Sequence, residues 1–358
     1  MQRALLQSSA RLARIMAIFV FTPLLLQACN GGHSADKKAE KTTGADTVIK
    51  GADPANQITA QSPLVPVDTA AYNRKLLFLA HNDSSSKFLI HRDYPLPGAI
   101  LPFKRIVAYY GNLYSKNMGV LGEYPPSVML PKLKAACKEW AAADTATPVL
   151  PALHYIAVTA QGSPGKDGKY RARMPFKQID SVLHMAATIN AIVFLDVQVG
   201  FSNVQAEIPL LEKYLEMPNV HLGIDPEFSM KTGKKPGSVI GTLDAADINF
   251  VSDYLAKLVK AHSLPPKILI IHRFTRKMVT NANDIRLHPE VQFIMDMDGW
   301  GPVVLKTDSY KAYVANEPVQ FTGFKLFYKN DIRKAGSKML TPAQVLALKP
   351  SPIYIQYQ

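Results

Sequence analysis

Cysteine is nearly absent from this sequence, which has 358 residues but only Cys29 and Cys137. With at most one disulfide available, the class of small exported domains held together by several disulfides is excluded. If Cys29 is used for another purpose, no intrachain disulfide is possible. The fold then depends on its hydrophobic core, in which we expect Cys137 to act as a small apolar side chain.

Several catalytic motifs are also missing. The sequence contains no H-E-x-x-H, no G-x-S-x-G, no P-loop and no G-x-G-x-x-G, which argues against zincins, nucleophile-elbow hydrolases, P-loop NTPases and dinucleotide-binding folds. No close His-x-His pair occurs, so we expect no metal and no cofactor. No compact motif of basic and aromatic residues occurs either, so we expect no nucleic-acid partner.

No hydrophobic run is long enough for a comfortable membrane span of ~20 residues. The N-terminal run, Ile15 to Leu26, follows three arginines and no acidic residue, a pattern typical of a secretory signal peptide. Leu26-Gln27-Ala28-Cys29 resembles a bacterial lipobox. We therefore expect residues 1–28 to be a signal peptide and Cys29 to carry lipid, which would anchor an exported protein to a bacterial membrane. An ordinary anchor helix is the alternative.

Composition and charge indicate a folded protein with anionic partners. Hydrophobic residues make up 47% of the chain, enough for a sizeable core. The formal net charge of +13 falls to +10 when the three arginines of residues 1–28 are removed. This charge favours lipids, uronic polymers or peptidoglycan carboxylates, although scattered lysines could also serve solubility alone.

The chain divides into four segments. Residues 1–28 form the signal peptide, and residues 29–70, with almost no aromatics, read as a flexible tether. Residues 71–104 are predicted to hold a short hairpin, since two apolar runs at 75–81 and 86–92 flank a polar turn. Residues 105–358 form the main domain.

The main domain alternates short apolar runs with helical patterns. Its predicted strands are 105–110, 148–154, 191–197, 220–225, 267–272, 291–296, 322–327 and 353–357, and its main helices 127–142, 176–189, 203–216, 244–262, 276–287, 303–315 and 341–348. Eight strands separated by helices predict an α/β fold, the (β/α)8 TIM-type barrel. Its final helix is missing or replaced by the N-terminal segment. A doubly wound open sheet is the rival fold.

Polar residues follow the apolar part of every predicted strand, where a barrel places its functional groups. The candidates for catalysis are the acidic residues Asp196, Asp225, Glu227 and Asp298. The candidates for substrate binding are Tyr110, His154, Gln198, His272, Asp296, Trp300, Lys325 and Gln356. Each of them could instead be a satisfied structural group.

The crowding of carboxylates at one end of the barrel has a chemical consequence. Like charges repel, so at least one carboxyl pKa should rise, which suits a general acid. Gly223 and Gly323 would face the barrel interior and leave room for a ligand or for bulky neighbours.

Four ordered blocks carry a resemblance that runs from about residue 105 to 358: 223–228 (Gly-Ile-Asp-Pro-Glu-Phe), 271–275 (Ile-His-Arg-Phe-Thr), 298–301 (Asp-Gly-Trp-Gly) and 323–328 (Gly-Phe-Lys-Leu-Phe-Tyr). Together they resemble a group of secreted bacterial proteins of uncharacterised function, including lipoproteins, that look like glycosidase-type barrels. The resemblance implies the barrel and export but no activity. The D-x-x-D-x-D-x-E signature of chitinase-like barrels is missing, so the resemblance does not imply their catalytic mechanism for this chain.

The sequence thus predicts an envelope lipoprotein with a glycoside-hydrolase-like barrel that acts on a polysaccharide or other carbohydrate. If it is an enzyme, Glu227 is the expected general acid, and Asp196 or Asp225 the nucleophile or base. A non-catalytic carbohydrate-binding or scaffold lipoprotein is the alternative. A phosphodiester hydrolase would need a metal cluster that the spacing does not indicate.

Overall fold

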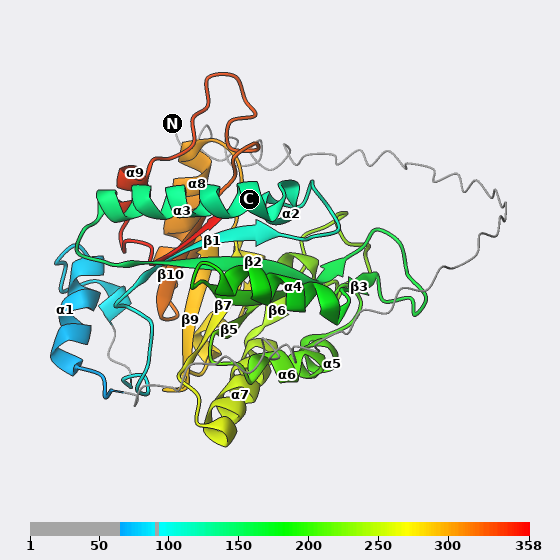
Figure 1. Cartoon of the computed structure of the whole chain (residues 1–358), viewed down its shortest axis with the longest axis horizontal. Helices are drawn as coiled ribbons and strands as arrows, with labels where there is room; N and C mark the ends of the chain where they lie inside the picture. Colours follow the sequence, from blue (N-terminus) through cyan, green and yellow to red (C-terminus); the bar gives the residue numbers. More distant parts are fainter. Residues whose placement is uncertain (1–64, 90–92) are drawn as a thin grey trace, which may run out of the picture. The chain divides into compact units, whose positions relative to one another are not determined.

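The computed structural model describes residues 65–89 and 93–358 (Figure 1). The expected signal peptide, residues 1–28, the lipidation site Cys29 and most of the expected tether, residues 29–70, lie outside these residues. Of the helices in the described ranges, none has both the length and the apolar character that a membrane span needs.

Eight parallel strands close into a barrel, as predicted. They are β1 (Arg105–Gly111), β2 (Val149–Ala160), β4 (Ile192–Val197), β5 (Val220–Ile224), β7 (Lys267–Arg273), β9 (Val291–Met297), β10 (Phe321–Leu326) and β11 (Tyr354–Tyr357). Pairing of β1 with both β2 and β11 closes the ring, so the rival open sheet is wrong. β2 runs beyond its predicted end and pairs in antiparallel fashion with β3 (Arg171–Arg173).

The strands form where the sequence is apolar on both faces. All residues of β1, β4, β5 and β7 are buried, as expected for parallel strands enclosed by helices outside and by side chains inside. β11 is the last element of the described chain and carries no helix after it, in line with the prediction.

Helices cover the outside of the barrel (Figure 1). They are α2 (Val120–Glu123), α3 (Pro126–Ala143), α4 (Phe176–Ala187), α5 (Val204–Glu207), η4 (Ile208–Leu211), α6 (Glu212–Leu215), α7 (Ala245–His262), α8 (Val303–Ser309), the π-helical η8 (Tyr310–Ala315) and α9 (Pro342–Leu346). α3 buries a stripe at helical spacing that ends in Trp140. The indole Nε1 of Trp140 donates a hydrogen bond of 3.0 Å to the Tyr357 hydroxyl, which fixes α3 against β11. Cys137 is half-buried beside this core, with a free thiol.

The predicted helix over 276–287 is wrong. This segment instead forms η6 (Arg276–Met278), β8 (Val279–Thr280) and η7 (Ala282–Asp284). β8 pairs with the short strand β6 (Leu243–Asp244). The Asp244 carboxylate accepts hydrogen bonds of 2.7 Å from the Thr280 hydroxyl and the Asn281 amide, and these contacts hold the segment beside β6.

The predicted N-terminal hairpin is wrong as well. Residues Thr69–Leu79 form helix α1, and Lys87–Leu89 form the 3-10 turn η3. Asp68 caps α1 by accepting from the backbone N–H of Ala71 at 3.0 Å. Tyr72, Leu76 and Leu79 recur at helical spacing and pack into an apolar cluster. The run at 75–81 is apolar because one helix face is buried, and the helix begins within the expected tether.

α1 and the segment after it close the N-terminal end of the barrel. Tyr72, Leu79 and Leu101 pack in one cluster with inward-facing strand residues such as Ile106 and Ile270. The backbone N–H of Ser351 donates to the Leu79 carbonyl at 2.7 Å. This end is filled mainly by apolar side chains, and the buried amide of Gln292 is bonded there to the backbone of Leu101.

Candidate functional site

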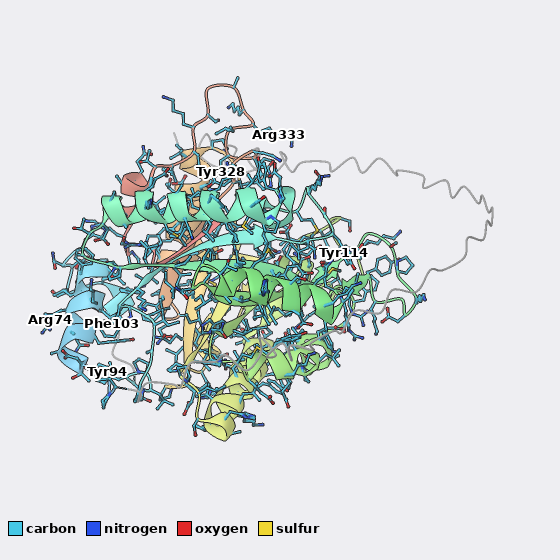
Figure 2. All side chains as sticks on the ribbon, viewed as in Figure 1. Arg74, Tyr94, Phe103, Tyr114, Tyr328 and Arg333 are labelled. Atoms are coloured by element: carbon cyan, nitrogen blue, oxygen red, sulfur yellow. The ribbon has the colours of Figure 1, made fainter. Side chains whose placement is uncertain are left out.

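The predicted polar side chains gather inside the barrel near the carboxyl ends of the strands. Ten of the twelve are buried, while Glu227 and Trp300 are half-buried. In Figure 2, Tyr114 marks this end of the molecule, and Arg74 and Phe103 mark the opposite end beside α1. The polar centre therefore lies where the strand-end pattern predicts it.

A histidine–aspartate cluster forms the deepest part of this centre. Asp196 on β4 places Oδ1 3.5 Å from Nε2 of His154 on β2 and 3.4 Å from Nε2 of His272 on β7. All three side chains have zero exposed surface. None of these three atoms has a hydrogen-bond partner among the described residues. Such burial is costly unless charge or a ligand compensates it.

Two glycines make this crowding possible. A Cβ atom on Gly223 of β5 would lie 2.5 Å from His154 Nε2 and 2.6 Å from Asp196 Oδ1. A Cβ atom on Gly323 of β10 would lie 2.5 Å from Asp296 Oδ1. Polar side chains therefore occupy the space that a Cβ atom would fill at both glycines. At Gly223, the missing side chain lets residues of the strands on either side of β5 approach each other.

A second group connects the cluster to the mouth of the barrel. The Tyr110 hydroxyl donates to Asp196 Oδ2 at 2.8 Å. Gln198 Nε2 donates to Asp225 Oδ2 at 3.1 Å and lies 3.4 Å from the Tyr110 hydroxyl. Asp225 Oδ1 accepts from the backbone N–H of Glu227 at 3.0 Å, so Asp225 also caps the turn η5 (Pro226–Phe228). This contact fixes the position of Glu227 at the rim.

A third group surrounds Asp298 on the loop after β9. Its Oδ1 lies 2.8 Å from Lys325 Nζ, and its Oδ2 lies 3.2 Å from His272 Nδ1. Lys325 Nζ also lies 3.8 Å from the centre of the Tyr110 ring, a cation–π contact. Asp296 Oδ2 is 3.4 Å from His272 Nδ1, and neither of its oxygens has a hydrogen-bond partner in the described structure.

Burial and charge push the pKa values of the two histidines in opposite directions. Burial lowers the pKa of His154 to about 4, and Asp196 offsets this only in part. Burial also opposes protonation of His272, but Asp196 and Asp298 outweigh it and hold the pKa of His272 well above its usual range. In turn, burial would raise the pKa of Asp196, yet His272 and His154 overcome this and lower it.

The pKa values of the carboxyl groups at the mouth are also shifted in opposite directions. Burial, with Asp225 and Asp298 nearby, raises the pKa of Glu227 to about 8. Burial raises the pKa of Asp225 to about 7. Asp298 is also buried, but Lys325 and His272 outweigh this and lower its pKa. Near neutral pH, a protonated Glu227 therefore stands near an ionised Asp298, as the predicted repulsion between carboxylates requires.

Gln356 lies in the deep cluster, together with a residue that the strand-end pattern missed. Gln356 Nε2 is 2.9 Å from His154 Nδ1 and 2.8 Å from the Tyr354 hydroxyl. The Tyr354 hydroxyl is itself 2.6 Å from His154 Nδ1. The missed signal is alternation, because Tyr354 lies two residues before Gln356 and so shares its face of β11.

Trp300 takes no part in these networks. It is half-buried on the loop after β9 and, within the described ranges, makes none of the hydrogen bonds or ring contacts of the polar centre. Its place beside Asp298 in the chain keeps it a candidate for contact with a substrate, and that role stays a prediction.

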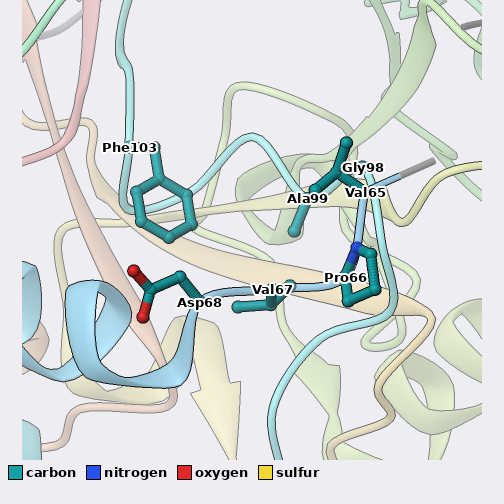
Figure 3. Close-up of a pocket in the computed structure, with 7 residues that line it drawn as sticks. All are labelled: Val65, Pro66, Val67, Asp68, Gly98, Ala99 and Phe103. Carbon is teal, nitrogen blue, oxygen red and sulfur yellow. The ribbon is translucent and has the colours of Figure 1, made fainter. Parts of the chain in front are cut away.

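A separate open hollow is lined by residues 65–68 and by Gly98, Ala99 and Phe103 (Figure 3). Apart from Asp68, which caps α1, its lining is apolar or glycine. It contains none of the residues of the polar centre, so the site candidates and this hollow are distinct features.

Comparison with known proteins gives no information about the chemistry of this site, which must be argued from its geometry. No protein-family model matches the chain, and no curated protein matches it significantly.

Proposed function

We propose that the protein is an exported lipoprotein whose barrel hydrolyses glycosidic bonds in an anionic polysaccharide of the cell envelope. The observation that carries this proposal is the unlike surroundings of two carboxyl groups at one mouth: Asp298 lies 2.8 Å from Lys325 Nζ, whereas Glu227 forms no ion pair among the described residues and burial raises its pKa to about 8. Glycoside hydrolysis uses such a pair, an acid for the leaving oxygen and a carboxylate on the other side of the bond.

Glu227 is the general acid in this proposal. Glu227 is half-buried at the mouth, and burial together with Asp225 and Asp298 raises its pKa to about 8, which keeps a proton available at neutral pH. Its backbone is held by Asp225 at 3.0 Å, which fixes the origin of the side chain.

Asp298 is the anionic partner, a role that the sequence pattern predicts for Asp196 or Asp225. Asp196 has no exposed surface, and Tyr110 bonds its Oδ2. Asp225 is held by Gln198 and its pKa is raised to about 7. Asp298 keeps 8% of its surface exposed and its negative charge is stabilised by Lys325. Asp196 and Asp225 then act as positioning residues.

The rim of the mouth suits an anionic polymer. The loops after β1, β5, β7 and β10 carry exposed basic side chains that pair with no carboxylate among the described residues: Lys116, Lys234, Lys235, Lys277, Arg333 and Lys334. Tyr114, on the same rim, is 61% exposed and offers a ring face for stacking on a sugar (Figure 2). Uronic or phosphate-bearing sugars match this charge.

The test compares product formation and affinity on a panel of anionic and neutral glycans. Glu227→Gln keeps the shape and removes the proton, so turnover should fall by ~10²–10⁴-fold while affinity changes only a few-fold. Glu216→Gln is the matched control, because Glu216 follows α6 (Glu212–Leu215) and precedes β5, at the opposite end of the barrel. Product formation unchanged by Glu227→Gln would remove Glu227 from the mechanism.

A non-catalytic carbohydrate-binding lipoprotein is the second candidate. The near-complete burial of ten of the twelve polar residues favours it, because a packed centre leaves substrate only the rim. In that case wild type forms no product from any glycan, and Trp300→Ala or Tyr114→Ala weakens binding through lost stacking.

A further inference from the structure

We propose that His154, Asp196 and His272 bind one divalent transition-metal ion, with Zn²⁺ as the preferred ion. This goes beyond the proposed hydrolysis, since it concerns the barrel centre beneath the mouth. It also departs from the sequence expectation of no metal, because the three residues come from β2, β4 and β7 and show no ligand spacing along the chain.

The distances between the three facing atoms suit a shared ion. Zinc binds imidazole nitrogen and carboxylate oxygen at about 2.1 Å, so two ligand atoms of a tetrahedral ion stand about 3.4 Å apart. Asp196 Oδ1 lies 3.5 Å and 3.4 Å from the two Nε2 atoms, and each of the three residues places one possible ligand atom within 4.8 Å of those of the other two. A hydrogen bond between such atoms would be about 2.7–3.2 Å long.

The three atoms are close enough to interact through charge, but none of them is satisfied by a hydrogen bond within the described part of the chain. His154 Nε2, Asp196 Oδ1 and His272 Nε2 are fully buried and have no hydrogen-bond partner among the described residues. Buried polar groups in native proteins are nearly always bonded, so unpartnered atoms that converge need an explanation. A cation supplies it for all three at once.

The opposite edges of the side chains carry the contacts that orient metal ligands. A ligating histidine usually donates its other N–H to a carboxylate or another oxygen. Asp196 Oδ2 accepts from the Tyr110 hydroxyl at 2.8 Å, and His272 Nδ1 lies 3.2 Å from Asp298 Oδ2 as an ion pair without a hydrogen bond. His154 Nδ1 faces the Tyr354 hydroxyl at 2.6 Å.

The amide of Gln356 fits the same arrangement. Gln356 Nε2 lies 2.9 Å from His154 Nδ1, and Gln356 Oε1 has no hydrogen-bond partner within the described residues. Exchanging the amide oxygen and nitrogen places an acceptor beside His154 Nδ1–H, which frees the Nε2 lone pair for the metal.

Donor type and charge select the class of ion. Two imidazole nitrogens and one carboxylate oxygen suit Zn²⁺ and related divalent ions better than Ca²⁺ or Mg²⁺, which prefer oxygen ligands. Three protein ligands leave a further coordination position, as in catalytic rather than structural zinc sites. Asp196 brings one negative charge to the ion, and Asp298, which lies 3.2 Å from His272, is balanced by Lys325 at 2.8 Å.

The experiment titrates the chelator-treated full chain with Zn²⁺ alone and measures bound metal by calorimetry and elemental analysis. We expect one equivalent per chain. His154→Gln, Asp196→Asn and His272→Gln should each weaken binding at least 100-fold, and Asp298→Asn by about 10–100-fold. His221→Gln is the matched control, because His221 on β5 is as fully buried but lies outside the three-residue group.

Two results would overturn the proposal: a folded wild type that binds no Zn²⁺, and a bound equivalent that survives all three ligand substitutions. If the variants do not fold, wild type loaded with Co²⁺ decides. An intense visible spectrum of tetrahedral cobalt is expected, and a weak octahedral spectrum would reject the site. Glycan hydrolysis is not part of any readout, so failure of the metal site and failure of the hydrolase remain distinguishable.

Discussion

Gly223→Ala is the most informative single change in the barrel centre. The new methyl group would stand 2.5 Å from His154 Nε2 and 2.6 Å from Asp196 Oδ1, well inside contact distance. Both neighbours are fully buried, so neither can move into solvent. The side chains must shift within a packed interior, and the spacing that favours a shared ion is lost with them.

The expected cost follows from overpacking. Forcing an extra methyl group into a filled core costs about 1–3 kcal/mol. Alanine also lowers the conformational entropy of the unfolded chain, which offsets this cost by about 0.4–1 kcal/mol. We expect a net loss of about 1–2 kcal/mol in the free energy of unfolding. For a domain of this size, that lowers Tm by roughly 2–8 °C.

The assay is urea and thermal unfolding of both variants and wild type, with Gly162→Ala as the control. A Cβ atom on Gly162 would meet nothing within 4 Å, so this variant should match or slightly exceed wild type. Equal stability of Gly223→Ala and Gly162→Ala would refute the account of the packed centre. Zn²⁺ affinity should fall in the first variant only.

Three further predictions concern pH, packing and anchoring. Burial holds the pKa of Glu227 at about 8 and of Asp225 at about 7 in the folded protein, above the unfolded value of about 4. The contribution of these two groups to the free energy of unfolding is therefore full below pH ~4 and is lost as the pH rises toward 8. Urea unfolding in the presence of chelator should show a flatter pH dependence for Glu227→Gln than for wild type. Tyr357→Phe leaves Trp140 Nε1 without its 3.0 Å partner and should cost about 1–3 kcal/mol in the free energy of unfolding, whereas no loss would discount this contact. Cys29→Ser should leave the protein unacylated and outside the membrane fraction, and mass spectrometry showing an unmodified Cys29 in mature wild type would contradict the anchor.

The barrel was predictable because its strands are buried on both faces. Runs such as 191–195 and 268–271 are continuous and apolar, and each strand of the barrel begins within one residue of its predicted start. The polar centre followed from the same pattern, since side chains at the carboxyl ends of parallel strands meet at one edge.

The N-terminal helix and the contacts inside the centre were not predictable in this way. An apolar run of seven residues suits a strand or a helix, and the Asp68 cap that begins α1 lies before it. The meeting of Asp196 with two histidines depends on register, on the missing side chain of Gly223 and on strands far apart in the chain. None of these appears as spacing in the sequence.

The central claim is that, at neutral pH, the Glu227 carboxyl group is protonated and the Asp298 carboxyl group is ionised. Carbon NMR of labelled side chains, in wild type and in the Glu227→Gln and Asp298→Asn variants, measures this directly. We predict that the Glu227 carboxyl titrates with a pKa of about 8. The pKa of Asp298 should lie below the usual range for aspartate, so that this group stays ionised at neutral pH. A Glu227 carboxyl that titrates near about 4.3, the ordinary value for glutamate, would contradict the proposed acid and with it the hydrolase.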